Sequence, residues 1–228
     1  MASATAAQAE ENRNVILPCQ KTGEYFIEDL GEVKLNPGYA FVKRLFDIVI
    51  SLVSLIILAI PMLVIALCIK LDSKGPVMYK QRRQGKNDKT FRIYKFRSMM
   101  VDAEKDGARW APDTDERSTK VGAFLRKTKM DELPQLINIL KNDMSFIGPR
   151  PERRCFIKEF ETYIHGFSER MKVKPGLTGY AQVYGGYYLK PEEKIVYDIE
   201  YIKNMSVKMD AKIMAKSVAV VLFKAGQK

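Results

Sequence analysis

Residues 48–69 read IVISLVSLIILAIPMLVIALCI, a run of 22 positions without a charged side chain. A straight helix of this length, at about 1.5 Å per residue, could cross the roughly 30 Å hydrocarbon core of a bilayer. Pro61 lies near the middle, where it removes a backbone hydrogen bond and clashes with the preceding turn, so we expect a kink. The run therefore predicts a bent, membrane-associated helix.

Basic residues on both sides of this run favour a re-entrant hairpin. Lys43 and Arg44 precede it, and residues 70–97 contain ten Lys or Arg against two acidic residues. Positive charge beside a membrane helix prefers the cytoplasmic side, so two basic flanks fit a helix that enters and leaves through one face. A single transmembrane anchor is the alternative that length alone favours. We expect a re-entrant helix over residues 39–71, kinked at Pro61.

The overall charge indicates an acidic partner. The chain of 228 residues has a formal net charge of +11, which suits nucleic acid, anionic lipid or a phosphorylated substrate. Three scattered cysteines give no disulfide framework and no Cys-x-x-Cys metal spacing, and they indicate a reduced cytosolic face. The single histidine, His165, argues against a Ser-His-Asp triad and a His-rich zinc site. The common glycine-rich nucleotide-binding loops are absent from the sequence.

The patterns predict a mostly helical α/β protein in three parts. Residues 1–38 form a polar, partly disordered arm, residues 39–71 the membrane helix, and residues 72–228 a folded domain. Alternating apolar and basic residues predict a small β-hairpin over residues 76–99, with its turn at residues 85–88. A turn is also predicted at residues 174–179.

Helical periodicity dominates after residue 130. The final helix has a basic stripe opposite an apolar one, so it either lies flat in the lipid interface or covers the core as an ordinary surface helix. The predicted faces are Leu133, Leu136, Ile137 and Leu140; Phe156, Ile157, Phe160 and Ile164; and, in the final helix, Lys208, Lys212 and Lys216 opposite Ile213, Met214, Val218, Val221 and Leu222.

Asp131 and Glu132 are adjacent carboxylates at the predicted start of a helix, with Pro134 in its first turn. An Asp in this position is an ordinary cap, because its carboxylate accepts hydrogen bonds from unpaired N–H groups. The positive end of a helix dipole keeps such carboxylates ionised. Ionised carboxylates can hold Mg²⁺ beside a diphosphate, or attack phosphorus directly. The pair therefore permits phosphate chemistry, with capping as the simpler alternative.

Four basic residues are candidates for binding phosphate. Arg150 stands between Pro149 and Pro151, which fix the backbone and lower the entropy that its side chain loses on binding. Arg126 lies five residues before Asp131. Lys95 and Arg97 alternate with aromatic residues on an extended segment, a pattern that can also stack nucleic-acid bases.

These motifs occur in the order found in a known family. The chain resembles the bacterial sugar transferases, the monotopic phosphoglycosyl transferases that begin glycoconjugate assembly on a polyprenol phosphate carrier. The resemblance runs from Phe41 to about Lys224. Besides the apolar hairpin, the segments that carry it are FVKRLFD (41–47), KFRSM (95–99), DELPQ (131–135), DMSFIGPRP (143–151) and KPGLTGYAQV (174–183).

The resemblance implies transfer of hexose 1-phosphate from a UDP-sugar to undecaprenyl phosphate, with release of UMP. It implies that Asp131 is the nucleophile of a phosphosugar-aspartyl intermediate, that Glu132 is its dyad partner, and that Mg²⁺ binds the diphosphate beside Asp131. Arg126 and Arg150 would hold phosphate. The enzyme would sit in the bacterial cytoplasmic (inner) membrane, among its lipids, with the catalytic domain on the cytoplasmic face and no nucleic-acid partner.

The chain departs from the family pattern at three positions. Ile60 stands where relatives often have Ser before the membrane proline, Tyr180 where Trp is common, and Asn142 where Gly is common.

Two alternative functions are also compatible with the sequence. One is that of a membrane-anchored, non-catalytic protein that binds nucleic acid or anionic lipid. The other is a glycosyltransferase that moves the sugar alone and releases UDP.

Overall fold

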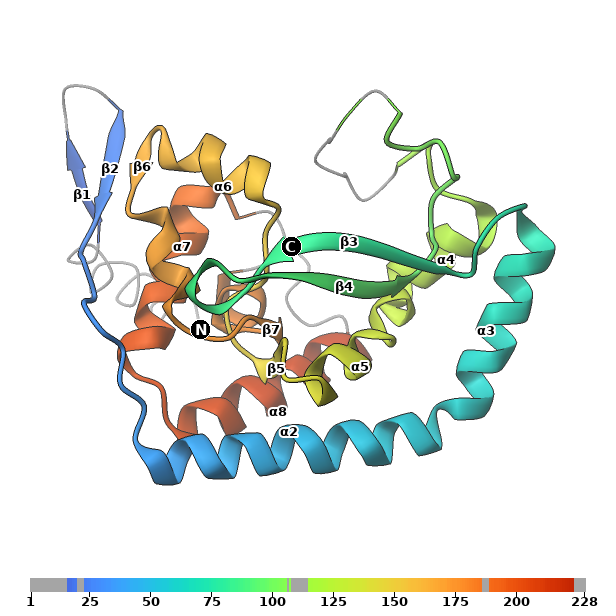
Figure 1. Cartoon of the computed structure of the whole chain (residues 1–228), viewed down its shortest axis with the longest axis horizontal. Coiled ribbons are helices and arrows are strands. Elements are labelled where there is room, and N and C mark those ends of the chain that lie inside the picture. Colours follow the sequence, from blue (N-terminus) through green and yellow to red (C-terminus); the bar gives the residue numbers. More distant parts are fainter. Residues whose placement is uncertain (1–15, 20–22, 106, 108–114, 186–188, 224–228) are drawn as a thin grey trace. The chain divides into compact units, whose positions relative to one another are not determined.

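The computed structural model describes residues 16–19, 23–105, 107, 115–185 and 189–223 (Figure 1). The predicted disorder at the start of the arm lies outside these residues. Helices predominate and the strands are short, which confirms the expected mostly helical α/β class. The α-helices described are α2 (Pro37–Ile57), α3 (Ala59–Asp72), α4 (Lys120–Thr128), α5 (Gln135–Leu140), α6 (Arg154–Glu161), α7 (Pro191–Lys203) and α8 (Val207–Phe223).

The strands described are β1 (Ile16–Cys19), β2 (Glu24–Ile27), β3 (Met78–Gln84), β4 (Thr90–Phe96), β5 (Ser145–Ile147), β6 (Ile164–His165) and β7 (Gly176–Thr178). Within the described residues they form three small sheets. One has the order β1–β2–β6, another pairs β3 with β4, and the third pairs β5 with β7 in parallel. The predicted β-hairpin is confirmed as β3 and β4, whereas the strands β1 and β2 in the arm were not predicted.

The chain divides into two compact units. The first unit comprises the described parts of residues 1–45, 83–91 and 143–228. The second unit comprises the described parts of residues 46–82 and 92–142.

The helix pair α2–α3 bends by 62° between Ile57 and Ala59. The amide of Leu58 still donates to the carbonyl of Ser54 at 2.8 Å. Pro61 has no N–H to give to the carbonyl of Ile57, four residues earlier, so the α-helical ladder loses a hydrogen bond there. The predicted kink is confirmed, and it falls one turn before the proline that causes it.

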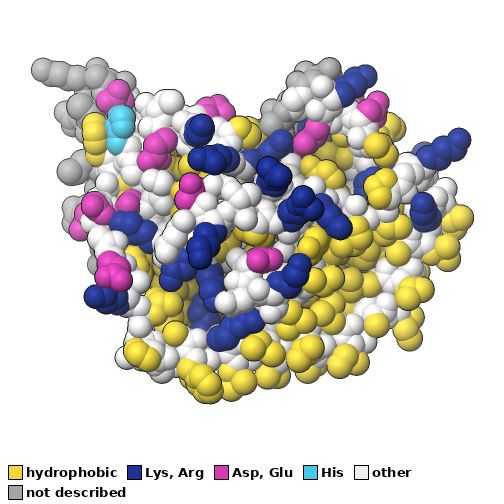
Figure 2. Space-filling view, viewed as in Figure 1, with side chains coloured by type: hydrophobic (Ala, Val, Ile, Leu, Met, Phe, Trp, Pro, Cys, Tyr) yellow, Lys and Arg dark blue, Asp and Glu magenta, His cyan; other side chains and the backbone are white. Residues whose placement is uncertain are grey.

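The same helix pair exposes a long apolar surface. Within the described residues, the requirements of length and hydropathy for a membrane span are met only by α2 and α3 taken together as a bent pair. Figure 2 shows their side chains as a yellow band along both helices. The large exposed apolar residues are Phe41, Val42, Leu45, Phe46, Val49, Leu52, Val53, Ile56, Ile57, Ile60, Leu63, Val64, Leu67 and Leu71.

One side of α3 is buried within the second unit. Ile69 packs with Phe96 at the end of β4 and Leu125 on α4, and all three are at most 3% exposed. This cluster joins α3, β4 and α4 into one core, so the second unit is a folded body and not only a hairpin. Met62, Ile65, Ala66, Val77, Met78, Val121 and Leu133 pack around the cluster.

The core of the first unit lies among α6, α7, α8 and the strands β5 and β6. Ile195, Ile199 and Ile202 are buried on one face of α7. This helix was not predicted, although its apolar spacing and Pro191 at its first turn are ordinary helix signals. Other buried members of the core are Met144, Phe146, Ile147, Ile157, Phe160, Ile164, Phe167, Val173, Tyr201 and Ile213.

Two local predictions in the first unit are wrong. Ile164 does not continue the helical face of Phe160, because α6 ends at Glu161 and Ile164 belongs to β6, which pairs in parallel with β2. The predicted turn at 174–179 contains strand β7, which pairs with β5. Gly176 allows this approach, since a Cβ there would lie 2.2 Å from the amide nitrogen of Gly148.

The final helix is confirmed as α8. Lys208, Lys212 and Lys216 are exposed, whereas Ile213 is fully buried. On the predicted apolar stripe, Ile213 is buried but Val218 is 50% exposed, so the stripe meets the core of the first unit only in part. The side chains of Val221 and Leu222 lie outside the described residues.

Candidate active site

Asp131 lies in a short 3-10 turn, Met130–Glu132, that follows α4 through Lys129. The expectation that Asp131 begins the α-helix is wrong, because α5 starts at Gln135. Pro134 has no N–H for the carbonyl of Met130, which accepts instead from Leu133 at 3.3 Å, three residues on. The first turn is therefore tightened, and Asp131 is held in it at 6% exposure.

Lys95 on β4 reaches both carboxylates of this turn. Its ammonium nitrogen lies 2.7 Å from Oε1 of Glu132 and 3.9 Å from Oδ2 of Asp131. The three side chains are all mostly buried. One positive charge thus neutralises part of two negative charges that come from adjacent residues. We call Lys95, Asp131 and Glu132 the dyad cluster.

Asn138 holds α5 against β4 and was missed by sequence reasoning. Its side chain is fully buried, accepts from the amide of Tyr94 at 2.9 Å and donates to the carbonyl of Arg92 at 2.8 Å. Both bonded residues precede Lys95 on β4, so these hydrogen bonds fix the strand that carries it. A buried amide on an otherwise apolar helix face is the signal that could have identified this residue.

Gln135 is also fully buried, and its side-chain amide has no hydrogen-bond partner in the described part of the chain. A buried amide without a partner is costly. Its position four residues after Asp131 places this polar group in the same segment as the dyad.

Arg126 lies in the last turn of α4 and is held by a neighbouring carboxylate. Its Nη1 is 3.2 Å from the hydroxyl of Ser118 and 3.7 Å from Asp115. Arg117 binds the same carboxylate through two nitrogens, at 2.8 and 2.6 Å. The hydrogen bonds from Arg117 hold the pKa of Asp115 at about 2, well below its usual range. Asp115 therefore stays charged and orders both arginines.

Arg97 is buried at the end of α3. It donates to the carbonyls of Lys74 and Ser73 at 2.7 and 2.8 Å, and to the hydroxyl of Ser73 at 2.9 Å. Gly75 makes room for it: φ is +127° there, and a Cβ would lie 2.0 Å from Nη1 of Arg97. The guanidinium thus satisfies carbonyls that a helix end leaves unpaired. Its predicted contact with phosphate stays a prediction.

Lys43 has a structural partner in the first unit. Its ammonium lies 2.7 Å from Asp210 on α8 and 3.2 Å from the hydroxyl of Tyr201 on α7, and Tyr39 also donates to Asp210 at 2.9 Å. The residue predicted as a basic flank of the membrane helix therefore fastens the start of α2. Arg44 follows it on α2.

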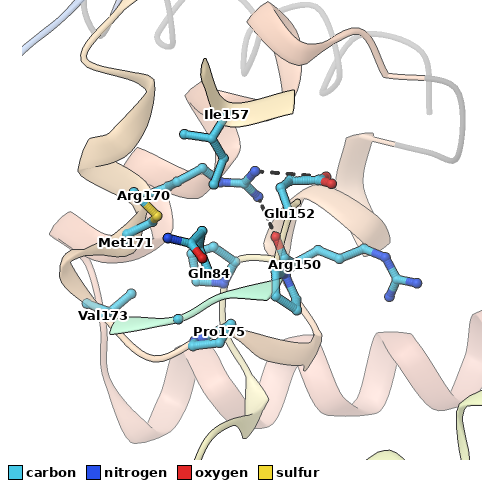
Figure 3. A pocket seen from close by; sticks show the side chains of 11 residues that line it. Gln84, Arg150, Glu152, Ile157, Arg170, Met171, Val173 and Pro175 are labelled. Carbon is cyan, nitrogen blue, oxygen red and sulfur yellow. Dashed lines mark hydrogen bonds and ion pairs between the residues drawn. The ribbon is translucent and has the colours of Figure 1, made fainter. Parts of the chain in front are cut away.

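Arg150 lies in the first unit, in the loop Gly148–Glu152 that follows β5. Figure 3 shows its guanidinium extending away from the Arg170–Glu152 pair. The backbone carbonyl of Arg150 accepts from Nη2 of Arg170 at 2.9 Å. The adjoining cavity has a volume of about 10 Å³, the room of one water, so it is no substrate pocket.

The predicted site residues therefore fall into two groups. Lys95, Asp131 and Glu132 meet in the second unit, which also contains Arg97 and Arg126. Arg150 belongs to the first unit, which is described separately.

The carboxylates of the dyad suit a shared metal site. The described residues contain no group of three His, Cys, Asp or Glu side chains placed to hold a metal. Mg²⁺ usually takes one or two protein carboxylates and completes its shell with water and substrate phosphate. Asp131 and Glu132 fit that donor set, provided that a bound diphosphate supplies further oxygens.

This chain belongs to the bacterial sugar transferase family, whose model matches residues 38–224. It is 45% identical over 196 residues to the UDP-N-acetylgalactosamine-undecaprenyl-phosphate N-acetylgalactosaminephosphotransferase of Aeromonas hydrophila, covering 85% of this chain and 46% of that protein. It is 43% identical over 181 residues to the UDP-glucose:undecaprenyl-phosphate glucose-1-phosphate transferase of Klebsiella pneumoniae, covering 77% and 39%. It is 42% identical over 185 residues to the exopolysaccharide production protein PSS of Rhizobium leguminosarum, covering 77% and 92%. The chain thus spans less than half the length of the first two relatives.

Proposed function

We propose that the protein is a phosphoglycosyl transferase that moves hexose 1-phosphate from a UDP-sugar to undecaprenyl phosphate and releases UMP. The observation that carries this proposal is the dyad cluster, a mostly buried pair of adjacent carboxylates with one lysine, in a chain of this family. Two relatives are named as undecaprenyl-phosphate sugar phosphotransferases and a third as an exopolysaccharide production protein. The proposed place in metabolism is the first membrane step of glycoconjugate or exopolysaccharide synthesis.

We propose two successive displacements at phosphorus. A carboxylate oxygen of Asp131 attacks the β-phosphorus of the donor, an O–P bond forms, and the bond to the α-phosphate oxygen breaks so that UMP leaves. The phosphate oxygen of undecaprenyl phosphate then attacks the same phosphorus and displaces Asp131, which is regenerated as a carboxylate. A covalent step lets one site treat a soluble donor and a lipid acceptor in turn.

The remaining residues position the reactants and neutralise charge, which is the main requirement of phosphoryl transfer. Glu132 is the dyad partner of Asp131, and Lys95 lies within reach of both. Arg126, Arg150 and Lys95 are proposed to bind phosphate oxygens. Arg97 is proposed to do so as well, while its guanidinium also donates to the carbonyls of Lys74 and Ser73. Mg²⁺ held beside Asp131 would neutralise charge on the diphosphate.

We also propose that α2 and α3 form the re-entrant membrane hairpin, with Lys43, Arg44 and Pro61 shaping it. The 62° bend and the exposed apolar side chains on both helices support this arrangement. Residues 1–38 would then be an arm, and residues 72–228 a catalytic domain on the cytoplasmic face of the inner membrane. The basic face of α8 would meet the lipid headgroups.

The identity of the released nucleotide tests the reaction. The purified membrane-bound protein is incubated with a UDP-sugar and undecaprenyl phosphate, and the nucleotide is separated by chromatography. UMP is the expected product, whereas UDP would indicate a transferase of the sugar alone. A panel of UDP-hexoses and UDP-N-acetylhexosamines in the same assay identifies the donor.

A trapping experiment tests the covalent step. A donor labelled in its β-phosphate, supplied without acceptor and quenched rapidly, should label the wild-type protein and leave Asp131→Asn unlabelled. Failure to trap label in a protein that turns over normally would count against the aspartyl intermediate.

A further inference from the structure

We propose that Arg170 is a positioning residue, which fixes the backbone of Arg150 and so aims its guanidinium at phosphate. The inference rests on the proposed phosphate-binding role of Arg150. All the contacts that support it lie within the first unit.

Arg170 is held rigidly by its own partners. Its Nη2 lies 2.6 Å from Oδ2 of Asp198 on α7, and these two side chains are 3% and 2% exposed. Nη1 of Arg170 faces Oε1 of Glu152 at 4.0 Å. Figure 3 shows the guanidinium between Glu152 and the backbone of Arg150. The same nitrogen, Nη2, thus contacts both Asp198 and the carbonyl of Arg150, so the ion pair holds the donor in place.

The backbone around Arg150 depends on donors from elsewhere in the unit. Proline has no N–H, so Pro149 and Pro151 offer only carbonyls. The carbonyl of Arg150 accepts from Arg170 at 2.9 Å, and that of Pro151 accepts from Nη1 of Arg83 at 3.1 Å.

The residues on either side are fixed by backbone donors. The amide of Gly176 donates to the carbonyl of Pro149 at 2.9 Å, and the amide of Gln84 donates to that of Glu152 at 3.0 Å. Four consecutive carbonyls, from residue 149 to residue 152, are therefore bound. Two of the four donors are arginine side chains.

Glu152 connects these two arginines. Its carboxylate lies 3.4 Å from Arg83 and 3.4 Å from Lys194. Burial opposes its ionisation, but Lys194, Arg170 and Arg83 outweigh that effect and hold the pKa of Glu152 below its ordinary value. Glu152 thus stays charged and keeps the arginines in place.

Stability alone does not account for this cluster. A buried ion pair contributes little net stability, and well-packed neutral residues of similar volume are often as stable. What an apolar replacement cannot supply is a donor to the carbonyl of Arg150. The geometry therefore points to orientation of the loop as the function of the Arg170–Asp198 pair.

A mutant cycle tests the inference in the full-length, membrane-bound protein. Arg170→Gln combined with Asp198→Asn removes both charges together and so avoids leaving one buried and unpaired. We expect KM for the UDP-sugar to rise about tenfold, with kcat changed less than threefold and the melting temperature nearly unchanged. In an Arg150→Ala background the same two substitutions should change KM less than twofold, because their effect passes through Arg150.

The control is the neighbouring pair Glu169–Lys172, at 2.6 Å, in the 3-10 helix Phe167–Lys172 that also contains Arg170. Glu169→Gln with Lys172→Met should leave KM unchanged. If the Arg170/Asp198 double variant does not fold, Arg170→Lys replaces it, with the same expected rise in KM.

The inference is overturned if the double variant or Arg170→Lys keeps the wild-type KM. It is also overturned if the rise persists in full in the Arg150→Ala background, or if Arg150→Ala itself leaves KM unchanged. The reaction class is tested separately by UMP release from the wild-type protein, so the two failures can be told apart.

Discussion

The ammonium of Lys95 lies 2.7 Å from the carboxylate of Glu132, although 37 residues separate them in the chain. This contact joins β4 to the 3-10 turn that precedes α5. It places one positive charge beside two carboxylates, which is the arrangement on which the proposed chemistry depends.

Lys95→Met should lower kcat/KM for sugar-phosphate transfer about 10- to 100-fold, equivalent to about 1.4–2.7 kcal/mol of transition-state stabilisation. The loss follows because the two carboxylates would lose the positive charge that lies 2.7 Å from Glu132 and 3.9 Å from Asp131. Turnover is measured by UMP release. Lys80→Met on the neighbouring strand β3 is the matched control and should stay within twofold of wild type.

Asp131→Asn should lower the turnover rate at least about 10³-fold. The variant protein should still float with liposomes in a density gradient. Asparagine keeps the shape of the side chain but is a much poorer nucleophile. A non-catalytic binding protein would keep its function with this substitution. Retained turnover in the variant would therefore exclude Asp131 as the nucleophile.

Arg97→Met should destabilise the protein by about 2–4 kcal/mol, because the carbonyls of Ser73 and Lys74 lose their donor in a buried setting. Gly75→Ala should destabilise it as well, since the added methyl group meets the guanidinium. Thermal unfolding in detergent measures both. Arg92→Met, at an exposed position on β4, the strand that ends just before Arg97, should change stability by less than about 0.5 kcal/mol. A stable Arg97→Met with lost activity would instead favour the phosphate-binding role.

The carboxylate of Asp115 should make the stability of the folded protein decrease as the pH falls in the acid range. Its folded-state pKa is about 2, below the ordinary value of 3.8, so its contribution is present above about pH 4 and is lost as the pH falls towards 2. We expect Asp115→Asn to be less stable than wild type by about 1–2 kcal/mol near pH 7. The difference should shrink below pH 4. A constant difference from pH 7 to pH 2.5 would show that the carboxylate is not held by Arg117.

The proposed re-entrant topology predicts that both ends of the helix pair lie on one side of the membrane. Single cysteines at the exposed positions Lys34 and Lys89, in a background without native cysteines, are treated with an impermeant maleimide. In intact bacterial spheroplasts neither should react, and after permeabilisation both should. Reaction of only one in intact spheroplasts would mean that Pro61 kinks a spanning helix. Pro61→Ala, which restores a backbone donor, should favour that spanning form.

Local signals predicted the elements whose cause is local. The break between α2 and α3 follows from Pro61, and the hairpin of β3 and β4 from alternation around a turn. The same reasoning placed Asp131 at a helix start, but Pro134 shifts the α-helix to Gln135 and leaves Asp131 in a tighter turn.

Elements that depend on distant partners were missed or misread. Strand β7 is a strand because it pairs with β5, about 30 residues earlier, and not because of its own composition. Asn138 and Arg170 show no motif in isolation. Their roles come from the backbone groups that they meet, 46 and 20 residues away.

The sequence by itself determined the apolar bent helix and the residue types available for phosphate chemistry. Proline lacks a backbone N–H in any context, and the charge of a side chain follows from its residue type. Only the tertiary structure decided how neighbouring basic residues are used. Lys95 and Arg97 are two positions apart, yet Lys95 contacts Glu132 and Arg97 binds the end of α3. The physical reason is that a side chain's partners are set by the elements packed around it, and such contacts are not encoded in the spacing of the residues.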